Sequence, residues 1–308
     1  MIFTVTLNPS VDYIVQLDNP QLGKLNRSNH EDKFPGGKGI NVSRVLKRMG
    51  VDSKPLGFIG GFTGQYIEDY LLQEEIVPDF VKVREDTRIN IKLKSETETE
   101  INAKGPQISA ADFQTLKDKI KQLTAQDMLV LAGSIPATLP ASTYEELVQL
   151  CAENGTNFIV DAEGELLTKV LAYHPFLIKP NHHELGEIFE TQITTCEQAI
   201  AYGRKLIEQG AQNVIVSLAG DGAVFINKEI SLIANVPSGE VKSSVGAGDS
   251  MVAGFLAKYA ETNDVKLAFQ YSVASGSATA FSIGLCSPEE VEQLQEFVKI
   301  QQYEERAR

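Results

Sequence analysis

The chain has 308 residues, of which 43% are hydrophobic and 22% are charged, with 24 Gly and 12 Pro. This composition excludes a disordered chain, a collagen and a disulfide scaffold, and the length is sufficient for a full hydrophobic core. The 28 Lys and Arg against 41 Asp and Glu give a formal charge of −13, which argues against nucleic acid as a partner. An anionic small molecule would need a local cluster of cations and backbone N–H groups.

Short apolar runs alternate with helical patterns along the chain, which is the rhythm of βαβ units. The runs lack polar alternation, as expected of parallel strands that helices cover on both faces. We expect such strands at Ile2–Leu7, Met128–Ala132, Phe158–Asp161, Phe176–Lys179 and Val214–Leu218. We expect capping boxes at Ser142-x-x-Glu145, Thr194-x-x-Glu197 and Ser287-x-x-Glu290, and helix ends at Gly50, Gly155 and Gly210.

Two stretches interrupt this rhythm, at about residues 11–34 and 80–103. In the second, Ile89, Ile91 and Leu93 alternate with polar residues, a pattern typical of a sheet with one wet face. We expect the two stretches to form a small antiparallel β-lid outside the helix-covered sheet, with Glu96–Glu100 at a solvated hairpin tip. No repeat or linker divides the chain, so we expect one domain over residues 1–308.

The cysteines indicate a reducing, cytoplasmic environment. Cys151, Cys196 and Cys286 are odd in number and form no C-x-x-C pair, which argues against disulfides and a zinc site. The run Ile2–Leu7 follows no basic segment, so it is interpreted as a strand rather than a signal peptide. The uncharged segment Leu267–Pro288 is rich in Ser and Ala, which favours a closely packed helix over a membrane span.

A glycine turn, Gly246-Ala247-Gly248-Asp249, opens an amphipathic helix. Free N–H groups at Gly246, Ala247 and Gly248 would stabilise an anion at the helix N-terminus. Asp249, at their edge, could accept a proton from a hydroxyl group that attacks this anion. The alternative is that Asp249 only complements the helix dipole and that the glycines only form a tight turn.

A second glycine turn, Phe34–Asn41, precedes another helix, and its Lys38 and Asn41 could face a polar ligand. The turn is neither a P-loop nor a dinucleotide fingerprint, because the glycine spacing of both motifs is absent. This absence removes most of the support for a hydride-transfer enzyme.

Two further strand ends carry polar or glycine-rich sequence. Lys179, Asn181 and Glu184 follow one strand, at the edge where open α/β sheets bind ligands, although Asn181 could instead cap the next helix. His182 and His183 accompany no metal-binding spacing, and we assign them no role. The turn after Val214–Leu218 could face a ligand or form a plain hairpin.

In chain order, six motifs resemble those of the ribokinase-like sugar kinases, in the phosphofructokinase B branch: Asn8-Pro-Ser-Val-Asp12, Gly36–Asn41, Thr87-Arg88, Lys179–Glu184, Ser217–Ala223 and Gly246–Ser250. The match spans nearly the whole chain. It implies a three-layer α/β/α ribokinase-like fold with a mainly parallel sheet and ATP-dependent phosphorylation of a ketohexose phosphate. Fructose 1-phosphate is the first candidate, with tagatose 6-phosphate and fructose 6-phosphate as alternatives. A sensor that has lost turnover is the alternative of another class.

The resemblance also implies roles at the nucleotide side of the site. Asp249 would be the general base, and Gly246, Ala247 and Gly248 would hold the transferring phosphoryl group. Lys179 would touch the ATP phosphates, and Asn181 and Glu184 would organise Mg²⁺ through water. The nucleotide would lie against a turn of small residues, formed by Ser217, Leu218, Ala219, Gly220, Asp221 and Gly222.

On the acceptor side, the resemblance implies that Asp12, Gly37, Lys38 and Asn41 bind the sugar. The sugar phosphate needs further cations and hydroxyls, for which Arg88, Lys38, Arg27 and Ser134 are the candidates. The lid of this family often pairs between subunits, so we expect a homodimer in which Arg27 could serve the neighbouring site. The adenine pocket would lie near Ala274–Gly284.

Overall fold

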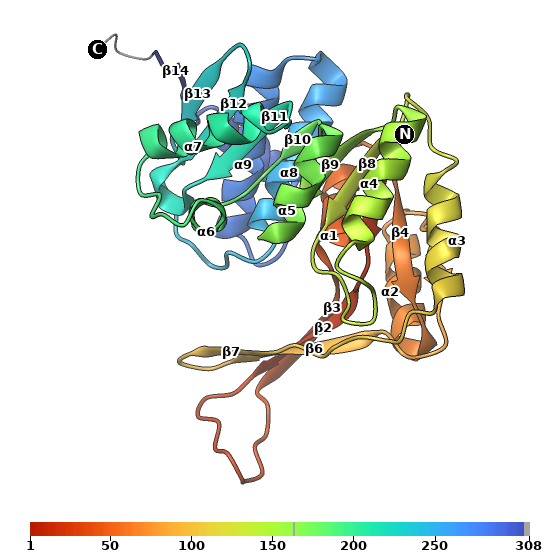
Figure 1. Ribbon diagram of the computed structural model, residues 1–308. Helices are drawn as coiled ribbons and strands as arrows, with labels where there is room; N and C mark the ends of the chain where they lie inside the picture. Colours follow the sequence, from red (N-terminus) through yellow and green to blue (C-terminus); the bar gives the residue numbers. More distant parts are fainter. Residues whose placement is uncertain (163, 305–308) are drawn as a thin grey trace.

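The computed structural model describes residues 1–162 and 164–304 and is built on a ten-stranded sheet in the order β14-β13-β12-β11-β10-β9-β8-β1-β4-β5 (Figure 1). Neighbouring strands from β11 to β5 are parallel, and those from β11 to β14 are antiparallel. The strands of this sheet are β1 (Ile2–Thr6), β4 (Ser53–Ile59), β5 (Val81–Lys82), β8 (Met128–Ala132), β9 (Asn157–Asp161), β10 (Leu177–Ile178), β11 (Asn213–Ser217), β12 (Ala223–Asn227), β13 (Ser231–Ala234) and β14 (Ile300–Gln302).

Helices cover both faces of the sheet, which confirms the three-layer α/β/α fold. Side chains of β8 alternate between two cores: Leu129 and Leu131 pack with α3, α4 and α7, whereas Val130 and Ala132 pack with α1, α8 and α9. The helices are α1 (Lys38–Arg48), α2 (Gly61–Gln73), α3 (Ala110–Ile120), α4 (Thr143–Asn154), α5 (Glu165–Val170), α6 (His182–Ile188), α7 (Cys196–Glu208), α8 (Ala247–Thr262), α9 (Val265–Phe281) and α10 (Pro288–Gln295), with short 3₁₀ turns at Leu171–Tyr173 and Ala219–Asp221. Burial on both faces explains the continuous apolar runs, and all five strands expected from them are present.

The glycines predicted to end helices are confirmed, but only one of the three predicted capping boxes is present. Gly50, Gly155 and Gly210 have positive φ and lie just beyond α1, α4 and α7, as expected. The capping box at Ser287 is confirmed, since the Ser287 side chain accepts from the Glu290 N–H and the Glu290 carboxylate accepts from the Ser287 N–H.

The other two capping boxes are wrong. Ser142 has helical φ and ψ and its Oγ donates to the Glu146 carboxylate at 3.1 Å, so it caps no N–H group. The cap of α7 is Thr195 rather than Thr194, with its side chain accepting from Gln198 N. The Gln198 side chain accepts from the N–H of Thr194 and thereby satisfies it, so that α7 begins one residue later than expected.

A second sheet of four strands, in the order β3-β2-β6-β7, lies outside the helix layers (Figure 1). Its strands are β2 (Ser10–Gln16), β3 (His30–Gly36), β6 (Arg88–Lys94) and β7 (Glu98–Ile101). We call it the small sheet. The expectation of a wholly antiparallel arrangement is wrong for the central pair, because β2 and β6 are parallel. Both strands follow parallel strands of the large sheet, β1 and β5, and therefore leave it in the same direction.

The faces of the small sheet also differ from the expected pattern. On β6 the apolar residues Ile89 and Ile91 are exposed or half-buried, whereas Asn90 and Lys92 are buried. The polar face of the strand is therefore the one turned toward the rest of the molecule.

The uncharged segment after Leu267 lies largely in α9, which packs along α8 at very short range. A Cβ on Gly254 of α8 would lie 2.2 Å from Ser275 Oγ, and one on Gly276 of α9 would lie 2.5 Å from Met251 Cγ. Small residues thus allow the two helices to approach closely, as the composition of the segment indicates. Among the described residues, no helix is long and apolar enough to cross a membrane.

Gly254→Leu should lower the free energy of unfolding by about 2–3 kcal/mol, because the new side chain has no space between α8 and α9. Chemical denaturation followed by circular dichroism measures the change. Gly220→Ala is the matched control, since no atom lies within 4 Å of its added Cβ. An unchanged stability of Gly254→Leu would show that the helices can separate at little cost.

Candidate active site

A cavity of about 1020 Å³ opens at the carboxyl edge of the large sheet. Residues at or just beyond the ends of β1, β8, β9, β10 and β11 line it, and the polar face of the small sheet covers one side. Parallel strands present their carboxyl ends at one edge, and ligands of open α/β sheets bind there where the strand order reverses, as it does between β1 and β8. The volume is sufficient for two small ligands side by side.

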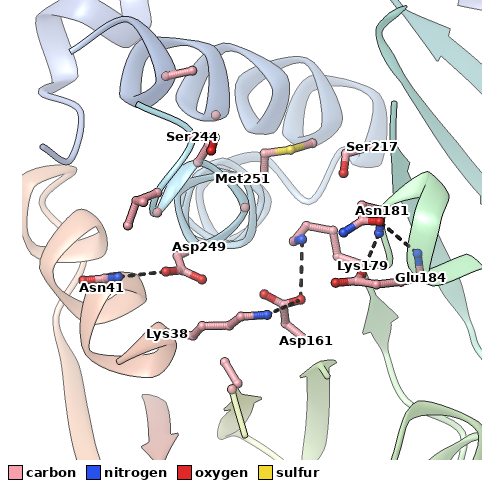
Figure 2. Close-up of a pocket in the computed structure, with 18 of the residues that line it drawn as sticks. Lys38, Asn41, Asp161, Lys179, Asn181, Glu184, Ser217, Ser244, Asp249 and Met251 are labelled. Atoms are coloured by element: carbon pink, nitrogen blue, oxygen red, sulfur yellow. Dashed lines mark hydrogen bonds and ion pairs between the residues drawn. The ribbon is translucent and has the colours of Figure 1, made fainter. Parts of the chain in front are cut away.

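Asp249 lies in the first turn of α8 and is only 5% exposed. One carboxylate oxygen, Oδ2, accepts a hydrogen bond of 2.8 Å from Asn41 Nδ2 of α1 (Figure 2). Burial raises the pKa of Asp249 to about 6, and the nearby charge of Asp161 adds to this increase. A carboxylate with such a pKa is suited to accept a proton near neutral pH.

The N-terminus of α8 is a glycine-containing turn beside this carboxylate. Gly246, at the N-cap, has a φ of 79°, which glycine adopts without strain. For Ala247 the expectation of a free N–H is wrong, because this group donates to Ser244 O at 3.3 Å. No acceptor within the described part of the chain is recorded for the N–H of Gly246 or Gly248, so these two groups remain available to an anion.

Asp161, at the end of β9, connects the two lysines of the cavity (Figure 2). Its Oδ1 lies 3.7 Å from Lys38 Nζ and 3.5 Å from Lys179 Nζ, and the residue is 2% exposed. Lys179 is itself buried, and a Cβ on Gly248 would lie 3.0 Å from its ammonium. The lysines therefore converge in front of α8. The sequence analysis did not identify Asp161 as a site residue. The available signal was its position as the one carboxylate at the end of the otherwise apolar strand Phe158–Asp161.

Asn181 is the N-cap of α6. This confirms the helix cap, which was one of the two roles expected for this residue. Its Oδ1 accepts from the N–H groups of His183 and Glu184, and the Glu184 carboxylate accepts from Asn181 N at 2.8 Å. The amide oxygen of Asn181 is thus already occupied, and its NH₂ group is the part left for a ligand. Burial raises the pKa of Glu184, whose other oxygen, Oε1, has no recorded partner among the described residues.

The turn after β11 is both a hairpin and part of the cavity wall. Strands β11 and β12 pair antiparallel, and the turn between them lines the cavity with Ser217, Ala219, Gly220 and Gly222. Leu218 is buried and Asp221 is exposed, and neither lines the cavity. The rings of His182 and His183, to which no role was assigned, lie 3.9 Å apart at the cavity wall.

The residues expected for the acceptor are brought together on the other side of Asp249. Asp12, Gly37, Lys38, Asn41, Arg88 and Ser134 all line the cavity. The Arg88 guanidinium donates to the carbonyls of Asn8 and Ala103. Arg27 does not line the cavity of its own chain and lies in the exposed segment between β2 and β3.

Two further groups of cavity residues were not named individually in the sequence analysis. Asn90 and Lys92 line the cavity from the polar face of β6, where alternation in the sequence was the available signal. The second group, which also lines the cavity, is Val236, Val241, Gly276, Ser277, Ala280 and Phe281. The last four lie within the segment Ala274–Gly284 expected near the adenine, and the first two carry no motif.

A buried carboxylate beside the N-terminus of a helix, in a large cavity at the carboxyl edge of a parallel sheet, is an arrangement that fits a small-molecule kinase. Residues 5–292 match the model of the pfkB family carbohydrate kinases, and the chain belongs to that family. It is therefore a phosphotransferase with an alcohol acceptor.

Individual relatives extend the comparison over almost the whole chain. The chain is 54% identical to a 1-phosphofructokinase of Bacillus subtilis, covering 97% of this chain and 99% of that protein. It is 40% identical to a D-tagatose-1-phosphate kinase of Bacillus licheniformis, with the same coverage. Phosphofructokinase-2 from Escherichia coli in complex with fructose-6-phosphate has a TM-score of 0.90 at 27% identity, with 96% of this chain and 98% of that chain covered. The same protein is also known in a tetrameric inhibited form.

Asp249→Asn should increase the free energy of unfolding at pH 8 by up to about 3 kcal/mol, because it removes a charge whose pKa is raised from 3.8 to about 6 by burial. The ionised carboxylate destabilises the fold fully above pH 6, so the gain should shrink as the pH falls from 6 toward 4. Urea unfolding at pH 8 and pH 5 measures it. Asp118→Asn, on an exposed helix face, is the control for the charge change. An equal effect of both variants would contradict the prediction.

Proposed function

We propose that the protein transfers the γ-phosphoryl group of ATP to a ketohexose phosphate, and that fructose 1-phosphate, phosphorylated at its 6-hydroxyl, is the preferred acceptor. The observation that carries the proposal is the buried Asp249, with a pKa of about 6, between the α8 terminus and the polar acceptor face. The 54% identity to a 1-phosphofructokinase supports this sugar, and the family membership supports the reaction.

Asp249 is proposed as the general base. Asn41 holds Oδ2, which leaves Oδ1 to receive the proton of the acceptor hydroxyl. As that proton moves to Oδ1, the hydroxyl oxygen bonds to the γ-phosphorus and the bond to the β,γ-bridging oxygen breaks, giving ADP and the phosphorylated sugar. The N–H groups of Gly246 and Gly248 face the charge that develops on the transferring oxygens.

The nucleotide is proposed to lie between the Ser217 turn and α9. Lys179, held by Asp161, would contact its phosphates, and the free NH₂ group of Asn181 would donate to a phosphate oxygen. Val236, Val241 and Phe281 supply apolar surface for the adenine at the far end.

The residues present fit Mg²⁺ beside the phosphates. Glu184 offers one carboxylate oxygen with no recorded partner among the described residues. Burial raises the pKa of Glu184 although Lys179 and Lys38 are near, and a bound cation would favour its charged form further. We assign the ion to Glu184, through water, and remove Asn181 from the expected ligands because its oxygen caps α6. When bound, Mg²⁺ neutralises charge on the β- and γ-phosphates.

The acceptor phosphate is proposed to bind Arg88, Lys38 and Ser134 under the small sheet, which would act as a lid within a single 1–308 domain. The outer face of this sheet exposes Ile89 and Ile101, so we propose that it pairs with a second copy as a homodimer. That dimer would bring the partner subunit's Arg27 near the site. We also propose that the enzyme acts in the cytoplasm, where its buried thiols stay reduced.

An ADP-release assay with Mg·ATP tests the function across fructose 1-phosphate, fructose 6-phosphate, tagatose 6-phosphate, tagatose 1-phosphate and unphosphorylated fructose. Fructose 1-phosphate should give the highest kcat/KM, and Asp249→Asn should lower kcat at least about 10³-fold while it still binds sugar phosphate. Turnover by Asp249→Asn at near wild-type rate would refute the general base. Inertness of the wild type toward every sugar would favour a sensor.

The kcat of the wild type should fall about tenfold per pH unit below a midpoint near pH 6, because protonated Asp249 cannot accept the hydroxyl proton. Asp161→Asn should move this midpoint to lower pH, since the Asp161 charge is one cause of the raised pKa. The kcat is measured at saturating concentrations of both substrates, so that protonation of the free sugar phosphate does not change the measured pH dependence. A midpoint that is the same in both proteins would contradict this electrostatic link.

A further inference from the structure

The polar face of the small sheet contains a buried lysine outside the family motifs. Lys92, on β6, is 9% exposed and lines the cavity. Its Nζ lies 3.9 Å from Asp12 Oδ2 on β2 and 3.4 Å from Glu100 Oε1 on β7. A lysine this buried requires carboxylates to compensate for its lost hydration. Here they come from the strands on both sides.

The Asp12 carboxylate is held at both oxygens. Ser10 Oγ donates to Oδ1 at 2.7 Å and Asn90 Nδ2 donates to the same oxygen at 3.2 Å, while Lys92 lies at Oδ2. These contacts come from β2 and β6 and restrict the rotation of the side chain. The remaining lone pairs of Asp12 are therefore directed at fixed positions in the cavity that it lines.

Among the residues of the small sheet that line the cavity, positive and negative charges are equal in number only while Lys92 is present. Asp12 and Glu100 stand against Lys92 and Arg88, all four of which line the cavity. A sugar phosphate carries a charge close to −2 at pH 7. Without Lys92, the face would be net negative and would repel such an acceptor.

We propose that Lys92 is a positioning residue that sets acceptor selectivity: it fixes Asp12 as the hydrogen-bond acceptor for the sugar hydroxyls and balances the charge of the small sheet's cavity face. The inference rests on the proposed function, because it takes a ketohexose phosphate as the acceptor. It assigns sugar discrimination to the pair on β2 and β6, separate from the chemistry at Asp249.

If Lys92 only stabilised the small sheet, a different experimental result would be expected. Lys92 and Glu100 lie directly opposite each other in the β6–β7 ladder, so their ion pair could serve only to join these strands. Glu100→Gln removes that ion pair and leaves the contact between Lys92 and Asp12. It is therefore the matched control for Lys92→Met, which removes both contacts and keeps the aliphatic stem.

The experiment measures kcat and both KM values for the wild type, Lys92→Met, Lys92→Arg and Glu100→Gln with fructose 1-phosphate, tagatose 6-phosphate and fructose 6-phosphate. Lys92→Met should raise the KM for the preferred sugar about tenfold or more, with kcat and the KM for ATP within about twofold, and should narrow the kcat/KM ratios between sugars. Lys92→Arg should recover most of the loss. Glu100→Gln makes the cavity face less negative and leaves the contact between Lys92 and Asp12, so it should not raise the KM for the sugar.

An unchanged sugar KM in Lys92→Met, equal changes in the sugar and ATP KM values, or the same defect in Glu100→Gln would each overturn the inference. If Lys92→Met does not fold, as judged by circular dichroism, Lys92→Gln is measured in its place. A wild type inert toward all three sugars would refute the proposed function and the role of Lys92 with it. An active wild type together with an unchanged sugar KM in the Lys92 variant would refute only the role of Lys92 and leave the proposed function in place.

Discussion

The site depends on charges buried together at one edge of a parallel sheet. Asp161 at the end of β9 lies between Lys38 and Lys179, and Asp249 lies close enough for the charge of Asp161 to raise its pKa. Removing such groups from water is costly unless opposite charges compensate each other. The two carboxylates and two lysines therefore form a set of equal and opposite charges within one small volume.

The position of Asp249 is fixed by packing as well as by charge. It stands in the first turn of α8, and α8 lies against α9 at a distance that only residues such as Gly254 and Gly276 permit. Its hydrogen bond to Asn41 joins α8 to the first turn of α1, which enters the site from a different strand connection. Helix packing and one side-chain contact together place the carboxylate at the edge of the glycine turn that opens α8.

The small sheet has an unusual distribution of polarity that suits a cover for the site. Its buried face carries Asp12, Asn90 and Lys92, whereas its outer face exposes Ile89 and Ile101. Buried polar groups are stable only when they are satisfied, and here the three side chains bond to one another or to nearby residues. An acceptor with several hydroxyls and a phosphate offers complementary groups to such a face.

Much of the fold and several of the residues that line the cavity could be predicted from the sequence. The apolar strand runs have a local cause, burial on both faces, and the Gly246–Asp249 turn has another, a glycine at the start of a helix. Asp249, Lys179 and Asn41 were predicted because each sits in a glycine turn or at a strand end.

Only the tertiary structure decided how distant segments meet. It brought Asp161 between two lysines from different elements and made β2 and β6 parallel neighbours. Spacing along the chain gives no distance between residues far apart in sequence. Which polar groups share one cavity therefore depends on the order of the strands, and the protonation of Asp249 depends on burial and on charges that only the folded chain places nearby.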